Sequence, residues 1–404
     1  MTTLQIENVR ATLEAGVSEL SAVARWSRYG KRDVFFRTTH PLVTSSGAPF
    51  VPAILLSAMH RKLDLEVDAP VSDDVIQAAR RVAGVFSAWH RGWHLSKVAA
   101  ASAAAGEMQT PPPANGVAMF FSGGVDSFYS LQKHRSEITH LVFVSGFDIP
   151  VRHLAMRQLV TTELRRTAER IGLPLVEVET NLRELSDSVA LSWEEQHGAA
   201  IAAVAYFLAP AFRKVFVPST YALPFVVPYG SHPGVDPLWS TKHLDLVHDG
   251  IEATRFDKIG ALISWDLALQ SLRVCYALVE GRYNCCRCKK CLWTMAFLRA
   301  HGALAQARTF DKPLDLRALS ETTLEKPEER YRFIQAIAML ERRGDDPELV
   351  DAMSKPLHRR YALRRNATRS LTRLRQSARA SLRRAARECR EFARIHFSPT
   401  SREN

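Results

Sequence analysis

Apolar segments alternate with amphipathic ones through the middle of the chain. Between them, residues 152–172 and 198–209 carry apolar residues at helical spacing, and a short helix is expected directly after the first apolar run. Strands that alternate with helices form a parallel sheet with helices on both faces. We therefore predict an α/β fold with a doubly wound, mainly parallel five-stranded sheet. Its strands are the apolar runs at 116–121, 138–144, 173–179, 213–219 and 244–250.

The segments on either side of this sheet show different patterns. Residues 32–38 are predicted to be a strand, and residues 51–63 and 73–91 to be helices. A Pro- and Ala-rich stretch then separates them from the first sheet strand and is typical of a linker. We predict an N-terminal α+β domain (1–100), a linker (101–115), the sheet domain (116–305), a helical extension (306–354) and a basic amphipathic tail (355–404).

The positive charge of the chain is concentrated at its end. The formal net charge is +12, and the residues from Lys355 onward carry 15 Lys and Arg against three Glu. The rest of the chain is therefore neutral, so predictions about charged partners concern the tail and not the sheet domain. Apolar residues recur every three or four positions from Leu371 to Phe392, as on one face of a helix. RNA, an anionic membrane, a partner protein or the body of the same chain would each fit such a segment.

The chain shows no sign of export or of a membrane span. Its first residues lack a basic segment followed by an apolar one, and the longest weakly polar run, 198–212, is too short to cross a bilayer comfortably. We expect a cytoplasmic protein, and an oligomer is compatible with the sequence.

The first predicted sheet strand runs into a loop of small and polar residues. Two glycines allow a tight turn and expose backbone N–H groups, and the helix that follows adds the positive end of its dipole. Such a loop suits a phosphate group. Asp126 would repel phosphate unless a cation lay between them, which indicates Mg²⁺. The loop consists of Ser122, Gly123, Gly124, Val125, Asp126 and Ser127.

A second group of charged residues follows the last predicted sheet strand. Asp249 stands at the end of that strand and is a candidate second ligand of Mg²⁺ beside the nucleotide. Arg255 and Lys258 are spaced i and i+3, so they share a helix face and could neutralise charge on a departing pyrophosphate. A solvated helix face with ion pairs is the structural alternative.

Five of the six cysteines lie within one short stretch. Cys285, Cys288 and Cys291 form a C-x-x-C-x-x-C motif, and Cys275 can supply a fourth thiolate. Four thiolates leave no open coordination position, as in structural zinc sites, so we predict Zn²⁺. An iron–sulfur cluster is the alternative that the spacing leaves open. Cys286 interrupts the motif and is expected to be a spare thiol.

The two motifs together give the chain a family resemblance. Ser-Gly-Gly-Val-Asp-Ser resembles the PP-loop of the N-type ATP pyrophosphatases, which include asparagine, NAD and GMP synthetases. Cys275-Tyr276 followed by the three-cysteine motif is similar to the 7-cyano-7-deazaguanine synthases of that group. The similarity covers roughly residues 117–300. It implies a Rossmann-like fold and an enzyme that splits ATP into AMP and pyrophosphate.

The resemblance implies a ligase that forms C–N bonds. A carboxylate or amide oxygen of a small molecule would be adenylated and then attacked by ammonia or an amine. The substrate itself does not carry over, because the family's substrate loop is replaced here by residues 219–241. Tyr229, Ser231, His232 and Asp236 are candidates for a substrate-binding wall in this long irregular segment, which could also be purely structural.

The main alternative is an RNA-modifying enzyme of the same fold, such as a tRNA thiolation enzyme, with the basic tail holding the RNA. Such an enzyme needs a sulfur-carrying cysteine near the loop. Residues 1–274 contain no cysteine, which disfavours this alternative. A protein that only senses a nucleotide is a further alternative.

Overall fold

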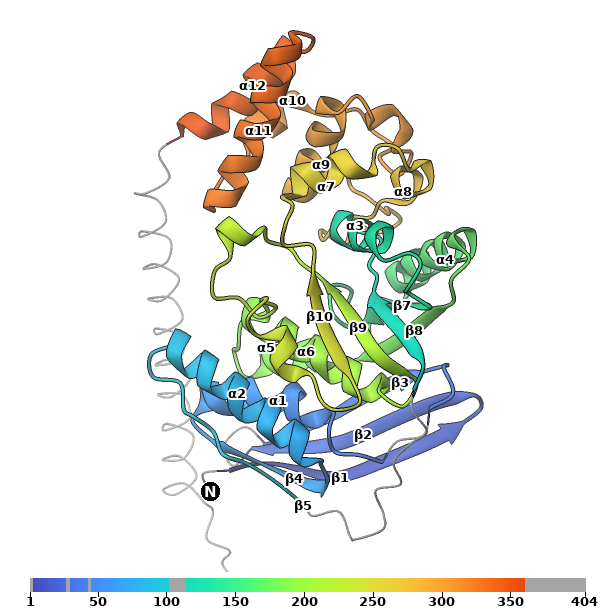
Figure 1. Ribbon diagram of the computed structural model, residues 1–404, viewed down its shortest axis with the longest axis vertical. Helices are drawn as coiled ribbons and strands as arrows, with labels where there is room; N and C mark the ends of the chain where they lie inside the picture. The colour runs from blue at the N-terminus through green and yellow to red at the C-terminus, as the bar shows by residue number, and fades with distance from the viewer. Residues whose placement is uncertain (1–2, 27–29, 43–44, 102–113, 360–404) are drawn as a thin grey trace, which may run out of the picture.

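One sheet runs through the whole molecule. The computed structural model describes residues 3–26, 30–42, 45–101 and 114–359. Ten strands form a mixed, mostly parallel sheet in the order β10-β9-β6-β7-β8-β3-β2-β1-β4-β5 (Figure 1). The strands are β1 (Thr3–Glu14), β2 (Val17–Trp26), β3 (Gly30–Thr38), β4 (Asp64–Pro70), β5 (Val98–Ala101), β6 (Gly116–Phe120), β7 (His140–Ser145), β8 (Leu175–Thr180), β9 (Phe212–Pro218) and β10 (Asp245–Asp249).

The five strands predicted from the apolar runs are all present, as β6 to β10, and neighbouring strands among them pair in parallel. Both faces of this half are buried. Met119 and Phe143 belong to one apolar cluster, whereas their neighbours Ala118 and Val142 belong to another on the opposite face. Alternate side chains of a strand point to opposite faces, so a strand covered on both sides needs a continuous apolar run. This is why the sequence pattern located these strands.

Helices cover the two faces of this half. The first apolar cluster is shared by α1 (Phe50–Arg61), α2 (Asp73–Trp89), α5 (Leu182–Ser188) and α6 (Trp193–Leu208). The second is shared by α3 (Val125–Lys133), α4 (Leu154–Ile171), α7 (Arg255–Leu262), α8 (Asp266–Ser271), α9 (Lys289–Ala300), α10 (Leu316–Ser320), α11 (Pro327–Arg343) and α12 (Pro347–His358). Short 3₁₀ turns occur at η1 (Leu223–Phe225), η2 (Asp236–Trp239) and η3 (Leu304–Gln306).

The sheet has ten strands and not the predicted five, because the N-terminal region adds five more. β3 and the helices α1 and α2 were predicted, but β1, β2, β4 and β5 were not. In β2, buried and partly exposed positions alternate regularly, but the buried ones include Ser18, Ala22 and Ala24. Small or polar inward residues weaken the alternation that identifies a half-buried strand. The alternation of β2 was therefore present in the sequence but too weak to predict the strand.

The two halves of the sheet join at β3 and β8. These strands pair antiparallel through Phe36↔Thr180, Arg37↔Glu179 and Thr38↔Val178. The first apolar cluster also crosses the junction, where the rings of Phe36 and Phe207 stack with centroids 5.5 Å apart. The N-terminal strands are thus continuous with the sheet domain, while the predicted domain boundaries stay a prediction.

The predicted helical extension contains α10, α11 and α12, which pack beyond α7 and α9 at one end of the molecule (Figure 1). Among the described residues, no helix combines the length and apolar character needed to cross a membrane. Most of the predicted linker and nearly all of the basic tail lie outside the described residues.

Candidate functional site

The candidate site lies where the direction of strand succession reverses. From β6, the chain proceeds to β7 and β8 on one side, and then to β9 and β10 on the other. In open parallel sheets, ligands bind at such a switch point, outside the carboxyl ends of the strands. The loop starting at Ser122 follows β6, and Ser219 follows the neighbouring β9. The predicted phosphate loop therefore occupies the expected position in the fold.

The backbone of the loop requires glycine at its turn. Gly123 has φ +72°, and a Cβ there would lie 3.0 Å from a methyl group of Leu164. Gly124 is the N-cap residue of α3 and supplies no side-chain cap. The first N–H groups of a helix have no partners within the helix, so they can bind an anion. Ser122 is exposed at the loop, whereas Ser127 is buried and donates to the Gly124 carbonyl at 3.0 Å.

The structure brings the three predicted catalytic residues together. The carboxylate of Asp126 contacts the Arg255 guanidinium, and its Oδ1 lies 3.2 Å from Lys258 Nζ. Lys258 is only 1% exposed, and its Nζ also donates to the Ser219 carbonyl at 2.6 Å. Arg255 opens α7, whose N-terminus is fixed by a capping box between Thr254 and Asp257. Residues from α3, α7 and the end of β9 therefore converge on one point.

The charges of this group are strongly coupled. Burial alone would raise the pKa of Asp126, but the positive charges of Arg255 and Lys258 outweigh it and lower the pKa to about 2. Burial is the main cause that lowers the pKa of Lys258. The charge of Asp126 opposes this shift, and the positive charge of Arg255 adds to it. Asp126 is thus ionised at neutral pH, and an added anion would relieve the buried lysine.

The sequence did not indicate two further residues beside the loop. Arg273 is 5% exposed, and its backbone N–H donates to the Gly123 carbonyl at 2.7 Å. Its Nε and the Tyr283 hydroxyl are buried without hydrogen-bond partners among the described residues. The Tyr283 hydroxyl lies 3.5 Å from the position a Cβ of Gly123 would take. Neither residue belongs to a motif, so only the folded chain shows that they adjoin the loop.

Asp249 faces a different set of partners. Its carboxylate accepts hydrogen bonds from Ser130 at 2.6 Å and Lys133 at 2.8 Å, and it lies 2.9 Å from His134 Nε2. These partners lie in and just after the last turn of α3, whereas Asp126 is in its first turn. The structure therefore does not bring Asp249 into contact with Asp126, and its role at the nucleotide stays a prediction.

The candidate substrate wall divides into two parts. Asp236 is buried, accepts from the Ser231 hydroxyl at 2.6 Å and lies 2.7 Å from His248 Nδ1. The contact with Ser231, together with the backbone N–H of His232 at 3.3 Å from Asp236, closes the loop on itself. The contact with His248 ties the loop to β10. Tyr229 instead packs against other aromatic rings of the loop and of α6, and the nearby Arg255 acts on its pKa, which burial raises. Among the wall candidates, Tyr229 is therefore the one that interacts electrostatically with Arg255 of the loop site.

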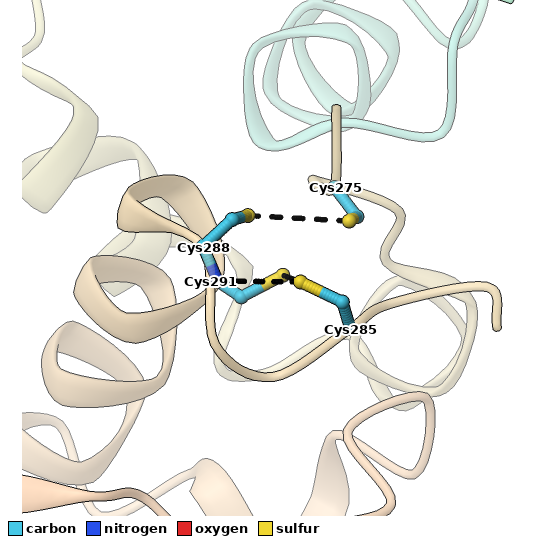
Figure 2. Close-up of side chains that lie close together, drawn as sticks. All are labelled: Cys275, Cys285, Cys288 and Cys291. Atoms are coloured by element: carbon cyan, nitrogen blue, oxygen red, sulfur yellow. Dashed lines mark hydrogen bonds between the residues drawn. The ribbon is translucent and has the colours of Figure 1, made fainter. Parts of the chain in front are cut away.

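The four predicted cysteine ligands gather at a single point (Figure 2). Their sulfur atoms all lie within 4.8 Å of one another, with 3.9 Å between Cys285 and Cys291 and 3.9 Å between Cys275 and Cys288. Four sulfurs around zinc at about 2.3 Å would lie about 3.8 Å apart. The geometry and burial fit a closed tetrathiolate site that could bind a metal such as zinc.

Local structure holds these sulfurs in place. Cys288 is the N-cap residue of α9, Cys291 lies in its first turn, and the Cys288 N–H donates to Cys285 Sγ at 3.2 Å. A helix N-terminus stabilises thiolates through its dipole. Cys286 has φ +58° and lies 3.6 Å from an Asp311 carboxylate oxygen, outside the cluster. The expectation that Cys286 is not a ligand agrees with this geometry.

The cysteine cluster and the phosphate loop are physically connected. Asn284, next to Cys285, accepts hydrogen bonds from the N–H groups of Val274 and Cys275, at 2.9 and 3.2 Å. Its amide also donates to the Leu272 carbonyl at 2.8 Å. This fixes the strip of chain that includes Arg273, which in turn is bonded to Gly123.

Comparisons with family models, with curated proteins and with solved structures found no match for this chain. Any inference about function therefore depends on the two motifs and on the geometry described above.

Proposed function

We propose that this protein is an adenylating enzyme that splits ATP into AMP and pyrophosphate at the loop after β6. The main support is a surplus of buried positive charge beside that loop. Arg255, Lys258 and Arg273 are largely buried there, and Asp126 is the carboxylate that contacts the first two. Buried charges without full compensation are costly. A polyphosphate would supply the missing negative charge.

Each residue has a separate part in this proposal. The N–H groups of Gly123, Gly124 and Val125 and the hydroxyl of Ser122 would bind the phosphates, with Ser127 shaping the turn. Lys258 and Arg255 would stabilise negative charge on the leaving pyrophosphate. Asp126 would hold Mg²⁺, which neutralises phosphate charge when bound. Asp249, whose carboxylate is hydrogen-bonded to the last turn of α3, stays a predicted second ligand.

The proposed reaction has two steps, adenylation and amide formation. A substrate carboxylate oxygen attacks the α-phosphorus, the bond to the bridging oxygen breaks, and pyrophosphate leaves with the bonding electrons. Ammonia or an amine then attacks the acyl carbon, loses a proton and displaces AMP, which yields an amide. Positioning and electrostatics provide most of the catalysis in such transfers, so no general base needs to be assigned.

The metal of the cysteine cluster is proposed to be zinc in a structural role. Four thiolates leave no open position for substrate. Metal analysis of the purified protein should find about one zinc per chain. Iron and acid-labile sulfide in its place would contradict the assignment.

Pyrophosphate release tests the activity. The protein is incubated with MgATP, ammonia and pools of carboxylic acids, and AMP and pyrophosphate are measured. We expect equal amounts of both products, with Lys258→Met reducing turnover by at least about 100-fold. Lys242→Met, which alters a lysine that is 79% exposed, is the matched control. Release of ADP and phosphate, or failure to bind ATP, would show the proposal to be wrong.

A further inference from the structure

A buried ion pair in the helical extension is not explained by packing. Arg332 and Glu328 lie one turn apart on α11 and are 4% and 1% exposed. Arg332 Nη2 lies 2.5 Å from Glu328 Oε1, and Arg332 Nε donates to the same oxygen at 3.1 Å. Glu328 Oε2 has no hydrogen-bond partner among the described residues. Apolar side chains would usually stabilise such a position at least as well as an imperfectly satisfied ion pair.

The packing of α11 against α7 places the ion pair of Arg332 and Glu328 on the side of the loop site. Gln335 accepts from the Thr254 hydroxyl at 2.9 Å and donates to Asp257 at 3.1 Å, so it binds the residues on either side of Arg255. Arg332 lies three residues before Gln335 and shares its helix face. Arg332 therefore faces the start of α7, which carries Arg255 to Asp126.

The electrostatics agree with this placement. Burial lowers the pKa of Arg332, the positive charge of Arg255 lowers it further, and Asp126 and Glu328 act in the opposite direction. Asp126 in turn responds to the charge of Arg332. These groups belong to one electrostatic unit, although α11 is remote from the loop in sequence.

The start of the same helix also reaches the candidate site. Lys326, the N-cap residue of α11, donates to the Tyr221 hydroxyl at 2.6 Å. Its Nζ lies 5.5 Å from the ring centre of Tyr229, the wall candidate that interacts electrostatically with Arg255. α11 thus borders the site at two points, and Figure 1 shows it beside α7 and α9.

We propose that Arg332 is a further phosphate-binding residue, which the helical extension contributes to the site after β6. The proposal rests on the function proposed above and adds a cation that neither motif contains. A guanidinium carries five N–H donors, and the contacts with Glu328 use only its Nε and Nη2. The remaining donors suit the terminal phosphates, which leave as pyrophosphate.

The test compares ligands that differ in their phosphates. Binding of ATP, inorganic pyrophosphate and AMP, each with Mg²⁺, is measured by calorimetry for wild type and Arg332→Met. We expect about 10- to 100-fold weaker binding of ATP and pyrophosphate, with AMP changed by less than about twofold. Arg342→Met is the matched control, because Arg342 is an exposed arginine of the same helix.

A second variant keeps the proposal testable if Arg332→Met does not fold. Glu328→Gln removes the negative charge that is paired with Arg332, so pyrophosphate should bind about 3- to 10-fold more tightly even though the fold is less stable. A purely structural ion pair would not strengthen pyrophosphate binding when it is broken. Unchanged or weaker pyrophosphate binding by Glu328→Gln would overturn the proposal.

The outcomes separate the two proposals. If wild type binds ATP and Arg332→Met folds and binds ATP and pyrophosphate equally well, the assignment of Arg332 is wrong and the proposed function is unaffected. If wild type binds neither ATP nor pyrophosphate, the proposed function itself is wrong.

Discussion

Asp126 is the residue on which the charges of the candidate site depend. It neutralises part of the charge of Arg255 and Lys258 and would have to exchange these contacts to hold a magnesium ion. Its lowered pKa is therefore a property of the folded state, and stability measurements can detect this shift without any ligand.

We expect Asp126→Asn to destabilise the protein at neutral pH and to lose this effect in acid. The pKa of Asp126 falls from an ordinary 3.8 to about 2 on folding. The ionised carboxylate thus contributes stability that is fully present above about pH 4 and is lost as the pH falls towards 2. The shift corresponds to about 2 kcal/mol at pH 7.

Denaturant unfolding of both proteins across this pH range measures the effect. The difference in the free energy of unfolding between wild type and Asp126→Asn should become smaller as the pH drops. Asp245→Asn, at an exposed position of β10, should have about the same free energy of unfolding as wild type across this pH range. A constant difference between wild type and Asp126→Asn from pH 7 to pH 2.5 would contradict the prediction.

Gly123→Ala should weaken nucleotide binding and stability together. The new residue would have to adopt φ +72°, where a side chain costs about 1–2 kcal/mol, and its methyl group would press on Leu164. Gly84→Ala is the control, because Gly84 lies within α2 and has open space for a Cβ. That substitution should be neutral or should stabilise by up to about 1 kcal/mol. Equal ATP binding by Gly123→Ala and wild type in a titration would refute the first expectation.

At the scale of elements, the cysteine cluster and the phosphate loop form one unit. Asn284 ties Cys285 to the segment before Cys275, and Arg273 ties that segment to Gly123. The metal site is therefore positioned to brace the loop, although the two motifs are remote in sequence.

Removal of the metal should loosen the loop. With a chelator, or in Cys288→Ser, hydrogen exchange of the amides of residues 122–127 should accelerate by at least about tenfold, because the bond from Arg273 to Gly123 loses its support. Cys286→Ser should keep the metal and the protection, since Cys286 lies outside the cluster. Full protection of the loop after complete metal loss would refute this coupling.

The sequence predicted elements best where a chemical requirement left a pattern. The strands β6 to β10 are buried on both faces, and the four cysteines have the spacing of a metal site, so both were recognised. Arg273, Tyr283 and Arg332 were missed because each reaches the site only through the packing of distant segments. Asp249 was placed at the correct end of its strand, but its side chain direction depends on α3, which no local pattern reveals.

At the scale of the whole molecule, the strands and helices of residues 3–101 complete the hydrophobic core of the sheet domain. α6 packs against α1, and Gln196 donates to the Ala53 carbonyl at 3.0 Å across this contact. The rings of Phe36 and Phe207 stack at the same interface. The sequence did not reveal this continuity, because the linker divides the two parts along the chain and sheet pairing over such distances leaves no local signal.

A protein that begins at residue 114 should therefore not form a stable monomer. Without residues 1–101, it would expose the edge of β8 and the apolar face of α6 that Phe36 and α1 cover. Supplying residues 1–101 as a separate chain should restore a folded complex. Size-exclusion chromatography and circular dichroism test both expectations, and a native-like monomer of residues 114–359 alone would refute them.

The order of the strands has a consequence for the behaviour of the protein at high concentration. The outermost strands, β5 and β10, have four and five residues, and β2, with 10, is paired on both sides. β1, with 12 residues, pairs with β2 but meets β4 only through Thr3 to Ile6. A strand with a free edge can recruit strands of other chains and start polymerisation. The two border strands offer only short edges, so the part of β1 after Ile6 is where an added strand of another chain would find the most unpaired backbone.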